Sequence, residues 1–166
     1  MTDQKTHDES VATVRQLIGG IKVCMLTTIG EDGNLQSRPM ATLESDPDGT
    51  LWFFTSTSGM KSEDIRRDKH VNLSYADPDD NRYVSISGTA SLVQDKEKER
   101  QLWNPLFAVW FPKGADDPEL ALLRVDIQKA EYWDSPGGKM VLLAGFIKAL
   151  TTHEKFSPGE HERVQM

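Results

Sequence analysis

The sequence has only one cysteine, Cys24, and this scarcity limits both its redox chemistry and its location. A single thiol forms no disulfide within the chain, as is usual for proteins of the reducing cytoplasm. Long hydrophobic runs are also missing: the longest nearly uncharged apolar stretch, residues 140–147, is far shorter than the ~20 residues that cross a bilayer. The polar start of the chain lacks the apolar segment of a signal peptide. We therefore expect a cytoplasmic protein that does not enter a membrane.

Positive charge is in deficit, because 19 Lys and Arg residues stand against 26 Asp and Glu residues, for a net charge of −7. Long nucleic acids bind through the neutralisation of many phosphates, so a chain of this charge is poorly suited to hold them. The four histidines are scattered, and no cysteine or third ligand cluster accompanies His153 and His161. A metal site is therefore not expected. Any anion that this protein binds should be small and held locally.

The hydrophobic pattern predicts short strands with helices inserted between them. Strands bounded by Gly-, Asp- and Asn-rich turns are expected at residues 22–29, 35–43, 50–55, 70–76, 82–93 and 120–133. Helices are expected at residues 8–18, 60–69, 95–106 and 139–150. Gly88 predicts a bulge in its strand. This order predicts a single, mainly β, α+β domain over residues 1–166, with a structured core at 8–150, a flexible tail at 151–166 and a small closed or partly open β-barrel.

Two segments about fifteen residues apart contain groups that bind phosphate. In the first, Arg38 and Met40 are expected on one face of a strand and Pro39 on the other. Pro39 cannot donate a hydrogen bond to a neighbouring strand, so the strand should be open or bulged there. The second segment, residues 55–62, is a hydroxyl-rich loop that leads into a helix and contains Lys61. Helix N-termini attract anions, although turns of this composition also occur as plain helix caps.

The two segments together favour a nucleotide-like ligand over a simple anion. The second segment lacks the Gly-x-x-x-x-Gly-Lys-Ser/Thr pattern of a P-loop. Arg38 can pair with a phosphate, and the exposed peptide groups of an open strand can hydrogen-bond to a planar heterocycle. Met40 adds an apolar surface beside them. The alternative is that Arg38 is an ordinary strand residue facing solvent.

The order of these motifs resembles a known flavoprotein pattern. Arg38-Pro39-Met40, then Phe53-Phe54-Thr55-Ser56, then Ser58-x-x-Lys61 are similar to the FMN-binding segments of split-barrel proteins of the pyridoxamine 5′-phosphate oxidase superfamily. Residues 82–88 and 123–133 resemble later core strands of that superfamily, and residues 110–114 and 157–160 resemble its general stress protein branch. The resemblance extends over about residues 8–162. It implies a six-stranded split β-barrel of the Greek-key type with peripheral helices.

The resemblance also implies a cofactor and its contacts. The cofactor would be FMN, with FAD as a possible substitute. Arg38 and Lys61 would contact the flavin phosphate, helped by Ser56 and Ser62. The residues expected to line the ring and the ribityl chain are Arg38, Pro39, Met40, Phe54, Thr55 and Tyr83.

Two tryptophans are implied to reach the flavin from a second subunit. Members of this superfamily build the site across the interface of a homodimer, which would bring Trp133, and less directly Trp110, to the ligand. Tryptophans are equally common as core or interface residues with no ligand contact. The resemblance therefore predicts a homodimer more firmly than it predicts these two contacts.

Departures from the pattern argue against the reaction that names the superfamily. True pyridoxamine-phosphate oxidases have a lysine for the substrate phosphate where this chain has Leu43, and an Arg-x-His segment that is missing after Trp133. We therefore expect an FMN-dependent oxidoreductase of unknown substrate and with no identified catalytic residue. The alternative is a flavin-binding sensor or carrier without turnover. Haem chemistry on the same barrel is disfavoured, because no histidine is placed to be an axial ligand.

Overall fold

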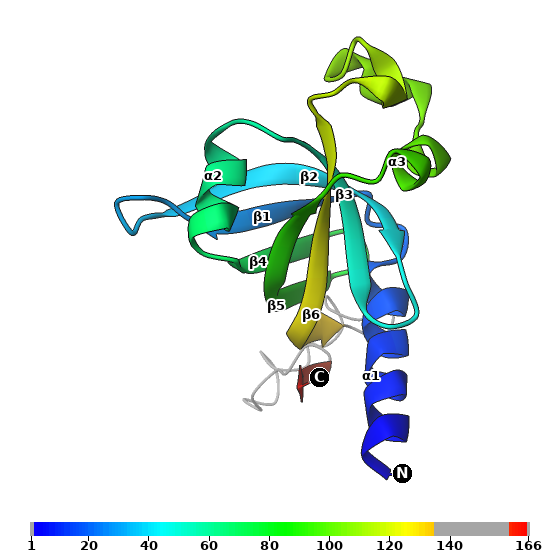
Figure 1. The fold of residues 1–166 in the computed structure, drawn as a ribbon. Helices are drawn as coiled ribbons and strands as arrows, with labels where there is room; N and C mark the ends of the chain where they lie inside the picture. The colour runs from blue at the N-terminus through cyan, green and yellow to red at the C-terminus, as the bar shows by residue number, and fades with distance from the viewer. Residues whose placement is uncertain (1, 135–159, 166) are drawn as a thin grey trace, which may run out of the picture.

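The strands of this protein curl into a closed barrel, seen in the computed structural model, which describes residues 2–134 and 160–165 (Figure 1). The strands are β1 (Val23–Ile29), β2 (Leu35–Ser45), β3 (Thr50–Ser56), β4 (His70–Asp77), β5 (Arg82–Val93), β6 (Leu120–Asp134) and β7 (Glu160–Gln165). The helices are α1 (Thr2–Ile18), α2 (Met60–Arg67) and α3 (Lys96–Leu102), with short 3₁₀ helices η1 (Pro105–Val109) and η2 (Gly114–Asp116). The fold is mainly β, as predicted.

Closure of the barrel depends on a pairing between strands that are distant in the sequence. The strands follow the order β3-β2-β1-β4-β5-β6-β7, and β3 also pairs with β6. All of these pairs are antiparallel. The order β4-β1-β2-β3 is a Greek key. These findings confirm the predicted six-stranded split barrel of the Greek-key type, with β7 added outside the closed ring.

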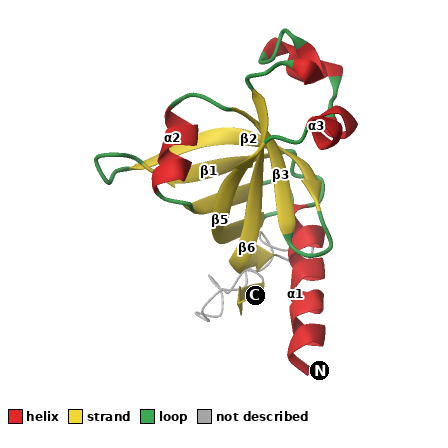
Figure 2. Ribbon diagram, viewed as in Figure 1, coloured by secondary structure: helices red, strands yellow, loops and turns green. Residues whose placement is uncertain are grey.

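Two apolar clusters bury the two faces of β3. The larger cluster fills the barrel and includes Phe53, Leu26 and Ile86, each with no exposed surface. Helix α1 adds the predicted apolar face of Val11, Val14, Leu17 and Ile18, all of which are buried. The smaller cluster lies on the other face of β3, where Trp52 and Phe54 pack with side chains from the segment between α3 and β6. This segment forms a lobe at the top of the view (Figure 2).

Gly88 produces the predicted bulge in β5. The register between β5 and β6 shifts between Ser87 and Gly88. A Cβ atom at Gly88 would collide with the backbone carbonyl oxygen of Asp126. Only glycine allows the two strands to approach this closely at the bend.

The elements differ from the prediction mainly at their ends. Helix α1 begins at Thr2 rather than at residue 8. Helix α3 ends at Leu102 rather than at residue 106, because Asn104 caps the separate 3₁₀ helix that starts at Pro105. The predicted helix over residues 139–150 lies outside the described residues. No helix of the described part is both long and apolar enough to cross a membrane.

The chain end also differs from the predicted flexible tail. Within residues 151–166, Glu160–Gln165 forms β7 and pairs with the last part of β6. The pairing of β3 with β6 extends only to Asp126, opposite Thr50, so the edge of β6 beyond this point is open. An open edge accepts another strand, which explains the addition of β7.

Candidate functional site

The barrel splits where β2 leaves β3. Only Thr42, Glu44 and Ser45 of β2 pair with β3, with a register shift between Thr42 and Glu44. Nearer the start of β2, Pro39 pairs with β1 and has no partner in β3. The far end of β3, through Ser56, pairs with β6 alone. The open strand that Pro39 predicts is therefore confirmed, and the two strands diverge around a gap.

A cavity of about 460 Å³ lies at this split. This volume is typical of sites for small molecules and cofactors. The lining residues are Val23, Pro39, Met40, Ala41, Phe54, Thr55, Ser56, Lys61, Phe107, Trp110 and Phe111. The structure thus brings together seven of the eleven predicted site residues: Pro39, Met40, Phe54, Thr55, Ser56, Lys61 and Trp110.

Aromatic side chains form one wall of the cavity. The Phe54 ring on β3 lies 5.0 Å from the Phe107 ring at an interplanar angle of 78°, and 6.5 Å from the Phe111 ring. The Phe107 ring lies 6.4 Å from the Trp110 ring, and Trp110 is 70% exposed. Contacts between edges and faces of this kind favour a fixed arrangement. The sequence prediction missed Phe107 and Phe111, because it treated their segment as the end of a helix and a loop.

Lys61 brings a positive charge into this largely apolar space. Its Nζ atom lies 3.3 Å from the Met40 sulfur. Burial, reinforced by the nearby positive charge of Arg38, lowers the Lys61 pKa from 10.5 to about 8. Within the described part of the chain, no carboxylate lies within ion-pair distance of Lys61. The ammonium group is therefore placed to gain from an anionic ligand.

The hydroxyls of Thr55 on β3 and Ser62 on α2 differ in their hydrogen bonding. Thr55 is among the residues that line the cavity, but its Oγ1 atom is buried and has no hydrogen-bond partner among the described residues. Because this atom is inaccessible to solvent, it does not face the open space of the cavity. Ser62, by contrast, donates a hydrogen bond to the Ser56 carbonyl oxygen at 2.5 Å. This bond ties the start of α2 to the end of β3.

The Arg38 guanidinium points into a buried polar cluster beside the cavity. It donates to the Thr28 hydroxyl at 2.6 Å and lies 3.7 Å from an Asp64 oxygen. Asp64 is almost fully buried and also accepts a 2.9 Å bond from Arg67. Arg38 shares the inward face with Met40, as the alternation predicts. Asp64 was not identified from the sequence, although its place three residues after Lys61 on a helix was a usable signal.

Glu119 occupies the hydroxyl-rich loop that the sequence assigns to phosphate. Its carboxylate accepts hydrogen bonds from the hydroxyls of Thr57 and Ser58, each at 2.9 Å, and from Ser56 at 3.5 Å. The bonds from Ser58 and Thr57 lower the Glu119 pKa. The sequence prediction missed Glu119, because its approach to the loop follows from the pairing of β3 with β6.

Tyr83 and Trp133 lie opposite each other on β5 and β6, and neither is among the residues that line the cavity. They are 38% and 40% exposed. Leu43, at the position of the oxidase lysine, packs against the smaller apolar cluster.

The chain belongs to a known family of proteins with this architecture. A closed six-stranded barrel with a ligand-sized cavity at its split defines a split-barrel protein. The family model described as "Pyridoxamine 5′-phosphate oxidase like" matches residues 9–157, and the chain is a member of this family.

Individual relatives agree with this assignment. Protein bli-3 of Neurospora crassa is 33% identical over 140 residues, which are 78% of this chain and 65% of the relative, so the chain spans less than two thirds of that protein. The general stress FMN/FAD binding protein from Xanthomonas citri is 30% identical, covers 79% of this chain and 89% of its own, and has a TM-score of 0.62. A structure from Jannaschia sp. CCS1, named for general stress protein 26, shares the fold with a TM-score of 0.74 at 22% identity, covering 95% of this chain and 99% of its own.

Replacing Lys61 with methionine should stabilise the ligand-free protein. At pH 7 the Lys61→Met variant should gain on the order of 1 kcal/mol, a value reduced for the partial exposure of the side chain. Above pH 8 the folded protein loses this proton while the unfolded chain keeps it up to about pH 10.5, so wild-type stability rises and the gain shrinks. Urea unfolding of both proteins from pH 7 to 10 measures this.

The matched control is Lys113→Met, which changes an exposed lysine of the lobe. This variant should stay within about 0.5 kcal/mol of the wild type at each pH. A constant difference between Lys61→Met and the wild type across this pH range would contradict the assigned burial of the charge.

Proposed function

We propose that this protein is a homodimeric flavoprotein that binds FMN in the cavity at the barrel split. One observation carries the proposal: the cavity is lined both by Lys61, which has no carboxylate partner among the described residues, and by the aromatic side chains of Phe54, Phe107, Trp110 and Phe111. A flavin phosphate has the anionic oxygens that suit Lys61, and its ring suits the apolar surfaces. The Xanthomonas citri relative, described as FMN/FAD binding, supports flavin as the ligand and leaves FAD as the second candidate.

The polar residues would divide between direct and supporting contacts. Lys61 would pair with the phosphate, and Arg38, whose side chain is 22% exposed, would contribute from the edge of its buried cluster. Ser62 holds the start of α2 against Ser56 and so fixes the position of Lys61. Glu119 would have to release the loop hydroxyls before the Ser56 hydroxyl could donate a hydrogen bond to a phosphate.

The apolar residues would hold the ring. Pro39 and Met40 come from the open part of β2, and Phe54 and Thr55 come from β3 on the other side of the split. At this point β2 pairs with β1 on one edge only, and its other edge leaves peptide groups available to the heterocycle. The strands of the barrel, rather than mobile loops, would therefore orient the ligand.

The bound flavin would supply hydride or electron transfer, which makes an oxidoreductase the leading function. Among the described residues that line the cavity, Lys61 is the only titratable group, so these residues offer no carboxylate or imidazole as a general base. This absence also suits a flavin-binding sensor or carrier. Reduction of the bound flavin by a nicotinamide cofactor, with steady turnover by an acceptor, would favour the enzyme.

The reaction of pyridoxamine-phosphate oxidases is not proposed. Leu43 stands where the substrate-binding lysine is expected, and it packs with apolar neighbours. We also propose a cytoplasmic location, on the ground that the one cysteine, Cys24, is a buried free thiol.

The test of the flavin assignment is a titration of the purified protein with FMN. Binding should quench flavin fluorescence, shift the visible spectrum and saturate at one FMN per chain. A parallel titration with FAD distinguishes the two cofactors. If neither flavin shows a saturable change, the proposal is wrong.

The phosphate contacts should appear as a difference between FMN and riboflavin. Arg38→Ala and Lys61→Ala should each weaken FMN by about 1–3 kcal/mol, the scale of a charge-assisted hydrogen bond. Riboflavin, which lacks the phosphate, should bind the variants and the wild type with nearly equal affinity. Lys113→Ala, in the exposed part of the lobe, is the charge-matched control and should alter neither affinity. Equal losses for both ligands would contradict the phosphate role.

We propose that a second copy of the chain completes the site. Val23 and Met25 on the outer face of β1 are 52% and 41% exposed, and Val23 also lines the cavity. Exposed apolar side chains beside a cavity are typical of an interface. Tyr83 and Trp133 lie side by side on paired strands, where they could reach the cavity of a partner. Trp110, which the resemblance places on the second subunit, instead lines the cavity of its own chain, so of these two tryptophans only Trp133 is proposed as a contact from the partner.

A hybrid dimer tests this shared site. One subunit carries Lys61→Ala and the other carries Trp133→Ala, each with a different affinity tag. In the hybrid, one site combines the intact Lys61 and the intact Trp133, and the other combines both changes. Half of the sites should therefore bind FMN with wild-type affinity, although each variant alone binds weakly. If Trp133 acts within its own subunit, no site in the hybrid will be restored.

A further inference from the structure

Lys61 combines three features that are uncommon for a lysine. It lies on the first turn of α2, its side chain lines the cavity, and among the described residues the Met40 sulfur is the one hydrogen-bond partner of its Nζ atom. Most lysines keep their ammonium group in water. This placement makes the amine a candidate reactive group, apart from any contact with a phosphate.

The charges around Lys61 favour the neutral amine. The cavity lining supplied by β1, β2, β3 and the lobe contains no carboxylate. Arg38 is the charged group that acts on Lys61, and its positive charge opposes protonation. On the same helix, Asp64 is committed to Arg38 and Arg67, and Glu63 is exposed. Burial in an apolar pocket beside another cation is the arrangement that activates lysines as nucleophiles.

The aromatic lining of the cavity favours a flat, apolar reaction partner. The Phe54 ring makes edge-to-face contacts with the rings of Phe107 and Phe111, and all three residues line the cavity together with Lys61. An aromatic aldehyde offers a ring for these side chains and a carbonyl for the amine.

We propose that Lys61 is a nucleophile that forms a reversible imine with aromatic aldehydes bound in this cavity. The neutral nitrogen attacks the carbonyl carbon and forms a carbon–nitrogen bond. The carbonyl oxygen then leaves as water, which takes up both amine hydrogens, and a carbon–nitrogen double bond remains. No oxidant or reductant is required. This activity goes beyond flavin binding and requires no flavin.

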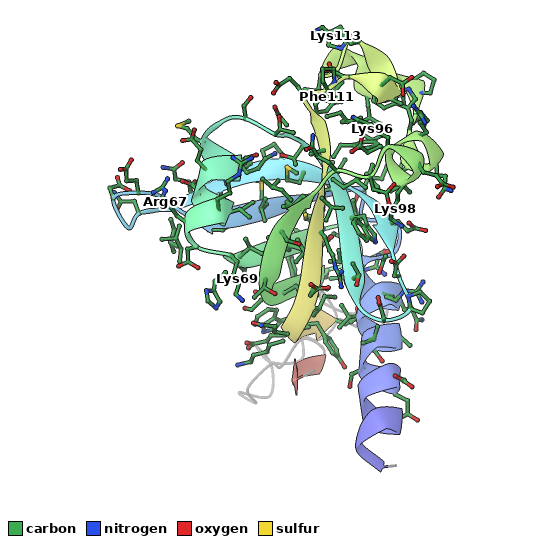
Figure 3. The ribbon with its side chains drawn as sticks, viewed as in Figure 1. Arg67, Lys69, Lys96, Lys98, Phe111 and Lys113 are labelled. Atoms are coloured by element: carbon green, nitrogen blue, oxygen red, sulfur yellow. The ribbon has the colours of Figure 1, made fainter. Side chains whose placement is uncertain are left out.

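Reductive trapping with benzaldehyde tests the proposal on the flavin-free wild-type protein. Sodium cyanoborohydride converts any imine into a stable benzylamine, and peptide mass spectrometry gives the rate at each lysine. Lys69 and Lys113 are exposed lysines on two separate parts of the molecule and serve as internal controls (Figure 3). At pH 7, Lys61 should be modified at least about tenfold faster than either control, because about a tenth of its amine is neutral.

Three further measurements sharpen the result. The rate at Lys61 should saturate with benzaldehyde and stop rising above about pH 8. Propanal, which has no ring, should show a much smaller preference for Lys61. Lys61→Arg keeps the charge and should remove the fast modification. Modification of Lys61 no faster than that of Lys69 and Lys113 in the wild type would overturn the proposal, whether or not the variant folds.

Added FMN separates this proposal from the flavin assignment. If flavin occupies the cavity, FMN should slow the modification of Lys61 and leave Lys113 unchanged. Fast modification that FMN does not slow would count against the flavin assignment and would leave the imine proposal standing.

Discussion

The pairing of β3 with β6 is the interaction on which the rest of this structure depends. All seven residues of β3 pair with β6, whereas only three of them pair with β2. The pairing with β6 therefore keeps the barrel closed even where β2 separates from β3. The same pairing fixes the outer face of β3, where Phe54 supports the aromatic lobe. It also brings Glu119, just before β6, to the loop that follows β3. The cavity, its aromatic wall and the position of Glu119 in the loop therefore all depend on the pairing of β3 with β6.

The sequence was sufficient for features that depend on neighbouring residues. Alternating side chains bounded by Gly- and Asp-rich turns located the six barrel strands within a few residues. Pro39 predicted the opening of β2, and Gly88 predicted the bulge of β5, since each residue restricts its own backbone. Features that depend on distant pairing were not accessible. Nothing near Glu160 indicates that this segment pairs with β6, because the open edge of β6 is created by the place where β3 ends.

The candidate site also combines features that the sequence predicted with features that depend on distant residues. Strand alternation gives the direction of a side chain but not its partner. Arg38 and Met40 share a face as predicted, yet the Arg38 guanidinium bonds to Thr28 and approaches Asp64 instead of lining the cavity. Likewise, the loop hydroxyls were predicted to contact a phosphate, but the group they bind in this structure is the carboxylate of Glu119. Local composition indicated affinity for an anion, and long-range contacts determine which anion is present.

The distribution of charge explains how an acidic protein can offer an anion site. The chain has a net charge of −7, which disfavours long polyanions. Arg38 lies on β2 and Lys61 on α2, and the two side chains differ in whether a carboxylate lies near their charge. Asp64 compensates Arg38, whereas no described carboxylate compensates Lys61. The uncompensated charge destabilises the empty protein, and an anionic ligand would remove that cost on binding. An ammonium group without a described partner in an apolar cavity favours a small ligand that has both an apolar body and an anionic group. The apolar body displaces water from the cavity, and the anionic group pairs with the ammonium.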